Sequence, residues 1–478
     1  MAASFLARCV TSNTIRSLAG AYRRTVNVSC KRYLLSQAYS CTEAWKKSLA
    51  DPIFSQVTLN EFMIQMRDQY EKHSSISAVD MEICANKLQE MDLDDASFIE
   101  ELIMKFRRSP AANPVRDSIV YVIIRMYMEH NIADRLIPLM KQRSVTGIFP
   151  DPYSISLLMD HFILKEDFHH AAQVAYEMMI QEDLSHPTSR LLALYSCVKF
   201  LKQANMDDLT PAEIKDEEGE EEWIPVRYIK YPSYDDHFDI KSEQYLLGKT
   251  LYFLGKEYAD TTLGHSLKVV GLGLYHKFKH CLQVLKDVAE SGDASITADT
   301  FSYVEASLDK AQARDPNKPE KEMGLLTIDD EIYKLLPTEE EKDVFRQQLQ
   351  QLKQMLTDKG KVVNVAFTAL AEELVQSQLS QHEPSDIEIQ VRRFDEWQEE
   401  RTKLLEEQIF MLQRNEKMAE INKKLKELQE KEETLRFFEL NDEIRLIQPK
   451  HLPKEKVEDD EETLRAKRIK RRKFRHNI

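Results

Sequence analysis

Short segments of helical apolar periodicity, separated by breaks, recur along the central part of the chain. The stretch 150–179 reads PDPYSISLLMDHFILKEDFHHAAQVAYEMM, with residues 165–167 between two such segments. The apolar stripe of the first segment consists of Ile155, Leu158, Met159, Phe162 and Ile163, and that of the second of Phe168, Ala171, Ala172, Ala175 and Met178. Asp151 can cap the first helix, and Pro152 suits its first turn. Because neither helix is long enough to be stable alone in water, the pattern predicts a helical pair that packs on neighbours.

The same pattern returns at a nearly constant interval. Pro114, Pro150 and Pro187 lie 36 and 37 residues apart, and each precedes an apolar helical stretch. Two helices in each unit of about 35 residues are typical of an α-solenoid, in which stacked neighbours bury the stripes that one pair cannot. The chain has only 11 glycines and 16 prolines among 478 residues, which also favours helices over hairpins. We therefore predict an all-α fold with a solenoid over residues 37–310.

The C-terminal part has a different composition. Residues 311–345 are polar and contain prolines, which predicts a linker that can include one short helix, and residues 346–448 are predicted as a helical region. Within that region, 362–379 is predicted as one amphipathic helix. Ser385 and Glu388 form a capping-box pattern directly after Pro384, which predicts the start of a separate long, charged helix.

The long helix carries part of a coiled-coil pattern. A seven-residue spacing joins Trp397, Leu404, Met411, Met418 and Leu425. The row read as its companion is mostly polar and consists of Arg401, Gln408, Asn415 and Asn422. The pattern leaves two interpretations open, a dimeric coiled coil and a single helix that lies along a partner.

Charge is distributed unevenly along the chain, whose net charge is −15. The first 42 residues hold six basic residues and no acidic one, which is typical of a cleaved mitochondrial transit peptide, here predicted over 1–36. The alternative is an ordinary basic N-terminal arm. The segment between this start and the last 15 residues has 52 basic and 81 acidic residues, so most of the surface repels nucleic acid.

The tail 449–478 is acidic and then basic, and is predicted to be disordered when alone. Its basic residues are Arg465, Lys467, Arg468, Lys470, Arg471, Arg472, Lys473 and Arg475. Eight cationic side chains without an acid predict salt-sensitive binding to RNA phosphates, so we take these residues as candidate RNA-binding residues. A solubility tail, a nuclear localisation signal and docking to anionic lipid are the alternatives.

No pattern in the sequence predicts catalysis, a metal site or a cofactor. The six cysteines form no CxxC pair, and the Gly248-Lys-Thr250 step has Glu243 where a phosphate-binding loop needs glycine. His169 and His170 are adjacent on a helix and point in different directions, so we interpret them as part of a polar surface between helices. No apolar run reaches the roughly 18 residues that span a bilayer. We predict that the protein is not an enzyme and has no membrane span.

The stretch 150–179 resembles a pentatricopeptide repeat, with a Pro150-Asp151 start and with Ala171 and Met178 seven residues apart in the second helix. Over essentially its full length the chain resembles the pentatricopeptide-repeat proteins of the mitochondrial small ribosomal subunit. The resemblance implies an RNA-binding structural component of that subunit, located in the mitochondrial matrix, that supports translation. Its implied partners are mitochondrial ribosomal RNA and neighbouring ribosomal proteins, with mRNA or tRNA as further candidates.

Members of the repeat family that read RNA sequence use a polar residue early in the first helix, paired with the residue after the repeat-end proline. The first position maps to Val120, Ser156 and Ala193, and the repeat-end partners of the first two map to Asp151 and Thr188. Only the pair Ser156 and Thr188 is polar at both places. The sequence therefore favours a solenoid used as a docking surface over base-by-base readout. A free mitochondrial factor that binds transcripts or tRNA and a coiled-coil protein scaffold remain the alternative functions.

Overall fold

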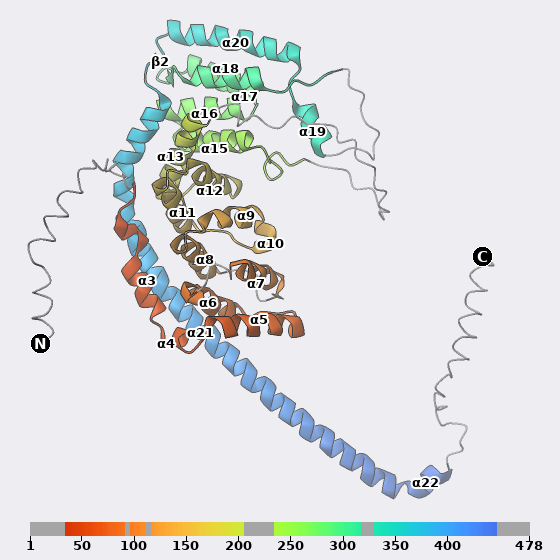
Figure 1. Ribbon diagram of the computed structural model, residues 1–478. Coiled ribbons are helices and arrows are strands. Elements are labelled where there is room, and N and C mark those ends of the chain that lie inside the picture. The colour runs from red at the N-terminus through yellow and green to blue at the C-terminus, as the bar shows by residue number, and fades with distance from the viewer. Residues whose placement is uncertain (1–33, 91–95, 111–115, 205–233, 317–327, 447–478) are drawn as a thin grey trace, which may run out of the picture. The chain divides into compact units, whose positions relative to one another are not determined.

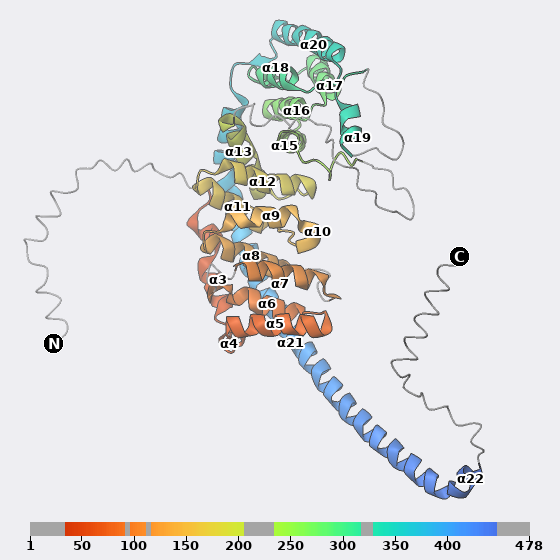
Figure 2. The same ribbon diagram turned by 45° about the vertical axis from the view of Figure 1, so that its right-hand side comes forward.

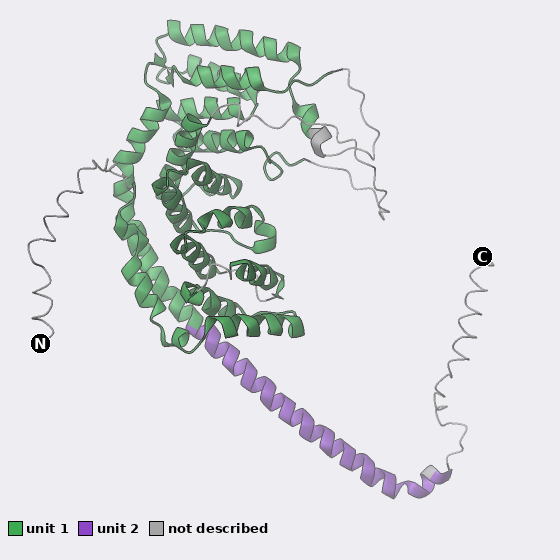
Figure 3. Ribbon diagram, viewed as in Figure 1, with its two compact units in different colours: residues 1–401 green, residues 402–478 purple. Residues whose placement is uncertain are grey.

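The computed structural model describes residues 34–90, 96–110, 116–204, 234–316 and 328–446. The predicted transit peptide up to Tyr33 and the whole basic tail lie outside the described residues. The chain divides into two compact units, residues 1–401 and 402–478, shown in two colours in Figure 3 and considered separately below.

The described part of the first unit is built almost entirely of helices. Its N-terminal half contains η1 (Gln37–Ser40), α3 (Thr42–Leu49), α4 (Pro52–Ser55), α5 (Leu59–His73), α6 (Ala78–Lys87), η2 (Leu88–Glu90), α7 (Ala96–Arg108), α8 (Asp117–Glu129), η5 (Ala133–Arg135), α9 (Leu136–Lys141) and α10 (Arg143–Thr146). It continues with α11 (Pro152–Leu164), α12 (Phe168–Ile180), α13 (Pro187–Gln203), α15 (Glu243–Glu257), α16 (Thr262–Leu274), α17 (Phe278–Glu290), α18 (Thr300–Lys310), α19 (Ile328–Leu335) and α20 (Glu339–Asp358). A short parallel pair joins β1 (Ile296–Thr297) to β2 (Val362–Val363).

Helices α5 to α18 and α20 of this unit stack in sequence order, as Figures 1 and 2 show. Helix α8 packs on α6 and α11, α11 packs on α12 and α13, and α15 packs on α16. One continuous apolar core runs from α3 to α16, and a second core joins α16, α17, α18 and α20. This arrangement confirms the predicted all-α repeat solenoid.

The turns within the repeats show why the pairs form where they do. Asp151 caps α11 by accepting a hydrogen bond from the amide of Ser154 at 3.1 Å, and Pro152 occupies the first helical position. The break between the helices of a pair falls at a residue with positive φ, namely Asn131, Glu166 and His276 in three of the pairs. A left-handed residue ends the first helix and lets the chain reverse, so the apolar stripes of both helices face the same core.

Helix α21 corrects two predictions. It runs without a break over Phe367–Glu439 and contains Pro384, so 362–379 is not a separate helix and the Ser385 pattern does not start one. A proline inside a helix removes one backbone hydrogen bond and costs about 3 kcal/mol. Leu379 and Asp386, on either side of the proline, are both buried, so packing on the repeats offsets that cost.

The segment predicted as a linker, 311–345, contains α19 and the first turns of α20. Helix α20 begins with a complete capping box in which the side chain of Thr338 accepts from the amide of Glu341 and the Glu341 carboxylate accepts from the amide of Thr338. This local signal makes the helix begin at Glu339, seven residues before the predicted helical region.

The described part of the second unit consists of the remainder of α21, from Thr402 to Glu439, and α22 (Asn441–Leu446). Across the described residues of the whole chain, no helix combines the length and the apolar character needed to cross a bilayer.

Candidate functional site on the repeat face

The positions that correspond to the base-reading residues of the repeat family lie on the first helices of the repeats, α8, α11 and α13, and are buried. Ser156 and Thr188 are both 0% exposed, and Val120 and Ala193 are buried as well. The hydroxyl of Ser156 donates to the carbonyl of Pro152 at 2.9 Å. The hydroxyl of Thr188 donates to Oδ2 of Asp386 in α21 at 2.5 Å. Both hydroxyls that could contact a base are therefore engaged within the chain.

The first half of α21 covers these positions, and we call the covered surface the repeat face. In Figures 1 and 2, α21 runs beside α8, α11 and α13 in both views. On the helix side of this contact, Val375, Leu379 and Phe394 are no more than 3% exposed. Phe394 and Trp397 pack their rings against Tyr121 of α8, with centroids 5.5 and 5.4 Å apart. An RNA strand could reach the repeat face only if α21 left it.

The chain just after the predicted transit peptide packs against the same face. Leu35 and Tyr39 are buried, and the Tyr39 ring stacks on Tyr153 of α11 with centroids 4.9 Å apart. The amide of Ser36 donates to Oε2 of Glu383 in α21 at 3.2 Å. Burial raises the pKa of the Tyr39 phenol well above its usual value. The folded unit thus includes residues before the predicted boundary at position 36.

Three polar contacts between the repeats and α21 form a regular series. On the repeat side, each residue stands directly before a first helix, as the N-cap residue of α8, α11 or α13. We name the series the N-cap ladder. Its contacts join Arg116 Nη2 to Glu400 Oε2 at 2.5 Å, Arg393 Nη1 to Asp151 Oδ2 at 2.6 Å, and His186 Nε2 to Asp386 Oδ1 at 3.1 Å.

The spacings of the N-cap ladder explain why a straight helix can follow the stack. Successive ladder residues are 35 positions apart in the repeats and seven positions apart in α21, in opposite chain directions. Seven helical residues advance about 10.5 Å, and packed helices lie roughly 8–10 Å apart. One heptad of α21 therefore spans about one repeat.

The charges of the N-cap ladder fix its register. Moving α21 by one heptad would place Arg393 opposite Arg116 and Asp386 opposite Asp151. Each of these pairs would bring like charges together, which is unfavourable. Hydrogen bonds to Asp386 add a further constraint. Burial alone would raise the pKa of Asp386, but donors from His186, Thr188 and Tyr39 outweigh it and hold the pKa below its usual value.

A buried arginine anchors α21 just before the second unit begins. Arg401 is 2% exposed, and its guanidinium donates to Asp51 Oδ2 at 3.1 Å and to Glu82 Oε1 at 3.3 Å. Glu82 also pairs with Arg116 of the N-cap ladder. Burial raises the pKa of Glu82, although both arginines act to lower it. Removal of either arginine would leave a buried carboxylate with less compensation.

Asp160 of α11 is a partly buried carboxyl beside the segment after the predicted transit peptide. Burial raises its pKa to about 7, against which the backbone amide of Leu35 acts by hydrogen bonding. Its Oδ1 atom has no hydrogen-bond partner among the described residues. The carboxyl therefore titrates near neutral pH instead of near its ordinary value.

The remaining motifs from the sequence are structural. His169 contacts Glu243 of α15 at 2.9 Å and His170 contacts Asp167 at 2.5 Å, which fits the predicted polar surface between helices. Gly248 lies so close to α16 that an added Cβ would stand 2.7 Å from the carbonyl oxygen of Gly271, so the Gly-Lys-Thr step is a close helix contact. Within the described ranges, no cluster of three or more His, Cys, Asp or Glu side chains could hold a metal ion.

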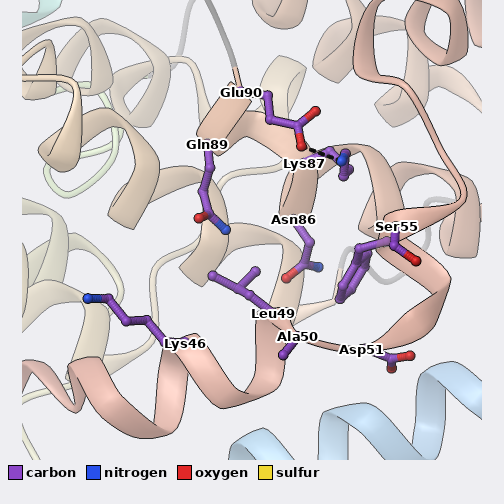
Figure 4. Close-up of a pocket in the computed structure, with 10 residues that line it drawn as sticks. Lys46, Leu49, Ala50, Asp51, Ser55, Asn86, Lys87, Gln89 and Glu90 are labelled. Carbon is purple, nitrogen blue, oxygen red and sulfur yellow. Dashed lines mark hydrogen bonds and ion pairs between the residues drawn. The ribbon is translucent and has the colours of Figure 1, made fainter. Parts of the chain in front are cut away.

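A cavity of about 380 Å³ lies beside α3, α4 and α6 (Figure 4). Within its polar lining, Lys87 contacts Glu90, and the side-chain amide of Asn86 donates to the carbonyl of Glu82 at 2.8 Å. The lining residues include neither histidine nor cysteine, so they offer no nucleophile with an adjacent imidazole base. This cavity does not suggest a reaction.

Comparison with known protein families identifies the family of this chain, which the contacts described above do not. Residues 1–427 match the family described as mitochondrial 28S ribosomal protein S27. The match includes the solenoid, the N-cap ladder and most of α21, and it confirms the resemblance drawn from the sequence. The match also gives the protein a mitochondrial location and ribosomal partners. The chain therefore belongs to the mitochondrial 28S ribosomal protein S27 family, whose members are proteins of the small ribosomal subunit.

Proposed function

We propose that this protein is a non-catalytic, RNA-binding structural component of the mitochondrial small ribosomal subunit that supports translation in the matrix. The repeats act as a scaffold that docks neighbouring ribosomal proteins. The basic tail, Arg465 to Arg475, supplies the main contact with ribosomal RNA.

The observation that carries this proposal is the covered repeat face. Ser156 and Thr188, the only pair with base-reading chemistry at both positions, are buried and hydrogen-bonded inside the chain. Base-by-base readout needs exposed donors and acceptors that reach unstacked bases. A factor that selects transcripts through its repeats is therefore disfavoured relative to a constitutive ribosomal scaffold.

Sedimentation of mitochondrial lysate through a sucrose gradient tests the proposal. We expect the protein to sediment with the small subunit and to stay there after a wash at moderate salt. A variant with all eight tail cations changed to glutamine should leave the subunit at lower salt than the unmodified protein, because fewer phosphates are neutralised. Recovery of the unmodified protein only at the top of the gradient would support the free factor or the scaffold instead.

Import depends, in this proposal, on the acid-free N-terminal segment. The chosen deletion ends at Tyr33, because Leu35 and Ser36 belong to the folded unit. We expect the shortened protein to remain in the cytosol, and residues 1–36 fused to a fluorescent protein to enter mitochondria. Mitochondrial import of the shortened protein would show that the signal lies elsewhere.

A further inference from the structure

The part of α21 in the second unit exposes large apolar side chains that have no cover among the described residues. Six of them are between 49 and 65% exposed: Met411, Met418, Ile421, Leu425, Leu428 and Leu435. An exposed, contiguous apolar stripe on a helix marks a surface that another element covers.

The six side chains follow two rows of a heptad. Met411, Met418 and Leu425 form one row, and the residues three positions after Met418 and Leu425 are Ile421 and Leu428. The polar row that includes Asn415 and Asn422 lies four positions after the first row, at the edge of this stripe. Positions spaced by three and four alternately form the interface of packed helices. We call the stripe from Met411 to Leu435 the distal seam.

The distal seam continues, by sequence spacing, an interface that the same helix already forms. Trp397, which packs on Tyr121 in the first unit, lies two heptads before Met411. Arg393, which pairs with Asp151, lies three heptads before Arg414, and the same row continues through Ile421, Leu428 and Leu435. Over 386–401 these rows bind the repeats. Beyond Arg401 the same spacing carries apolar residues that lack a partner in the second unit.

The flanks of the distal seam are cationic or neutral. One flank consists of Lys417, Lys424 and Lys431, all exposed, and the other of Asn415, Asn422, Gln429 and Arg436. Two copies in antiparallel orientation would place lysines against lysines. In parallel orientation the lysines would face neutral side chains and an arginine. Neither pairing gains from opposite charges at the flanks, so a second copy is disfavoured.

Single-stranded RNA also fits the distal seam poorly. Bases stack on aromatic rings, whereas the six exposed apolar side chains of the seam are aliphatic or methionine, and Arg414 and Glu432 occupy the two remaining positions of its rows. An amphipathic helix whose apolar stripe is bordered by carboxylates matches both the apolar rows and the lysine flank. We propose that the distal seam docks an acid-flanked amphipathic helix of another protein.

The test uses a labelled helical peptide of about four heptads, with leucine at the two seam positions and glutamate at both flanks. A second peptide has lysine at the flanks and is otherwise identical. Binding to the full chain is measured by fluorescence anisotropy. We expect the acidic peptide to bind at least about tenfold more tightly than the lysine peptide, because only its flanks oppose the lysines in charge.

Variants locate the binding. Ile421→Glu combined with Leu428→Glu should weaken the acidic peptide by at least about tenfold, since both substitutions place charge in the seam. Ile409→Glu, on the opposite side of the same helix and 46% exposed, is the matched control and should change binding by less than about twofold. Changing Lys417, Lys424 and Lys431 to glutamate should reverse the preference between the peptides.

Three outcomes would overturn the proposal. If the two peptides bind equally tightly, or if neither binds, the lysine flank does not select an acidic partner. A doubled mass in sedimentation equilibrium that Ile421→Glu abolishes would make a second copy the occupant. Loss of single-stranded RNA binding in the Ile421→Glu, Leu428→Glu variant, with intact binding in the Ile409→Glu control, would assign the seam to RNA. The peptide and mass results do not depend on whether the tail binds ribosomal RNA.

Discussion

Asp151 shows how one residue serves both the repeat and the interface. Its Oδ1 atom accepts from the amide of Ser154 at 3.1 Å and caps α11, while its Oδ2 atom accepts from Arg393 at 2.6 Å. The cap is a local interaction that the sequence predicts. The pair with Arg393 joins positions 242 residues apart, and the local sequence around Asp151 gives no sign of it.

Substitutions can separate these two contributions. Asp151→Asn keeps an oxygen for the cap but removes the charge that faces Arg393, so it should lower the free energy of unfolding by less than about 1 kcal/mol, because Arg393 is partly exposed. Asp151→Ala should cost about 1 kcal/mol more, through loss of the cap. Urea denaturation measures both. Arg393→Met should lower the free energy of unfolding by about as much as Asp151→Asn, and the variant with both substitutions should lose little more than either alone. Additive losses would contradict a direct pair between the two residues.

Asp160 predicts a pH dependence of stability. Its pKa in the folded chain is about 7, against an ordinary value of 3.8. Between these values the folded state binds more protons than the unfolded state, so this residue makes the free energy of unfolding fall as the pH rises from about 4 to about 7. Asp160→Asn keeps an oxygen for the amide of Leu35 and removes the titration.

We therefore expect Asp160→Asn to be more stable than the unmodified chain at pH 8, by on the order of 2 kcal/mol, and the difference to shrink toward pH 5. Urea midpoints at four pH values measure this difference. Asp68→Asn, which removes an exposed carboxylate from α5, is the matched control. A stability gain that is the same at every pH would show that the carboxyl is not the cause.

At the scale of elements, α21 behaves as part of the solenoid over its first half. It buries apolar residues on the repeat face, continues through Pro384 and keeps one register along three repeats. Helical propensity alone would break it at the proline, and tertiary packing overrides that tendency.

Truncation should reveal this dependence. A chain that ends at Arg401 should unfold cooperatively, whereas one that ends at Ala366 leaves Tyr121 and the buried side of α8 exposed. We expect the shorter chain to melt at least about 5 °C lower and to bind an apolar dye. A synthetic peptide of residues 367–401 added in trans should restore the melting temperature, and the same peptide with Phe394→Glu should not. Equal melting of both truncated chains would refute the role of α21.

At the scale of the whole molecule, charge is separated along the sequence. The acidic body between the two basic ends carries 81 acidic residues against 52 basic ones, so the tail is the part best suited to phosphate contact. In the proposed function, this acidic body contacts neighbouring proteins and not RNA.

Replacing the eight tail cations with glutamine should reduce the slope of log affinity against log salt for ribosomal RNA fragments. The expected change is about 3–4, from roughly 0.7 for each single-strand phosphate contact and about four to six side chains engaged. Stability should change by less than about 0.5 kcal/mol. Glutamine at Lys46, Lys47, Lys72 and Lys286, all exposed in the body, is the control and should leave the slope nearly unchanged. Equal slopes for the tail variant and the unmodified protein would exclude the tail as an RNA anchor.

The sequence by itself determined the features that depend on neighbouring residues. The 3.6-residue periodicity, the cap at Asp151, the prolines at the repeat starts and the break at 165–167 all involve hydrogen bonds and contacts within a few residues. The helices and their pairing can therefore be predicted from the order of residues. The capping box at Thr338 was equally local and was obscured only by the polar composition around it.

Tertiary structure alone decided what lies on the repeat face. The hydroxyl of Thr188 contacts Asp386 in a helix that begins about 180 residues later, and nothing local to Thr188 encodes that contact. Each repeat of 35 residues adds about one helix diameter to the length of the stack, and seven residues of α21 advance by about the same distance. This agreement in length exists only once the repeats have stacked. Local periodicity determined which segments form helices. The apolar surface created when those helices stack determined that α21 covers the repeat face.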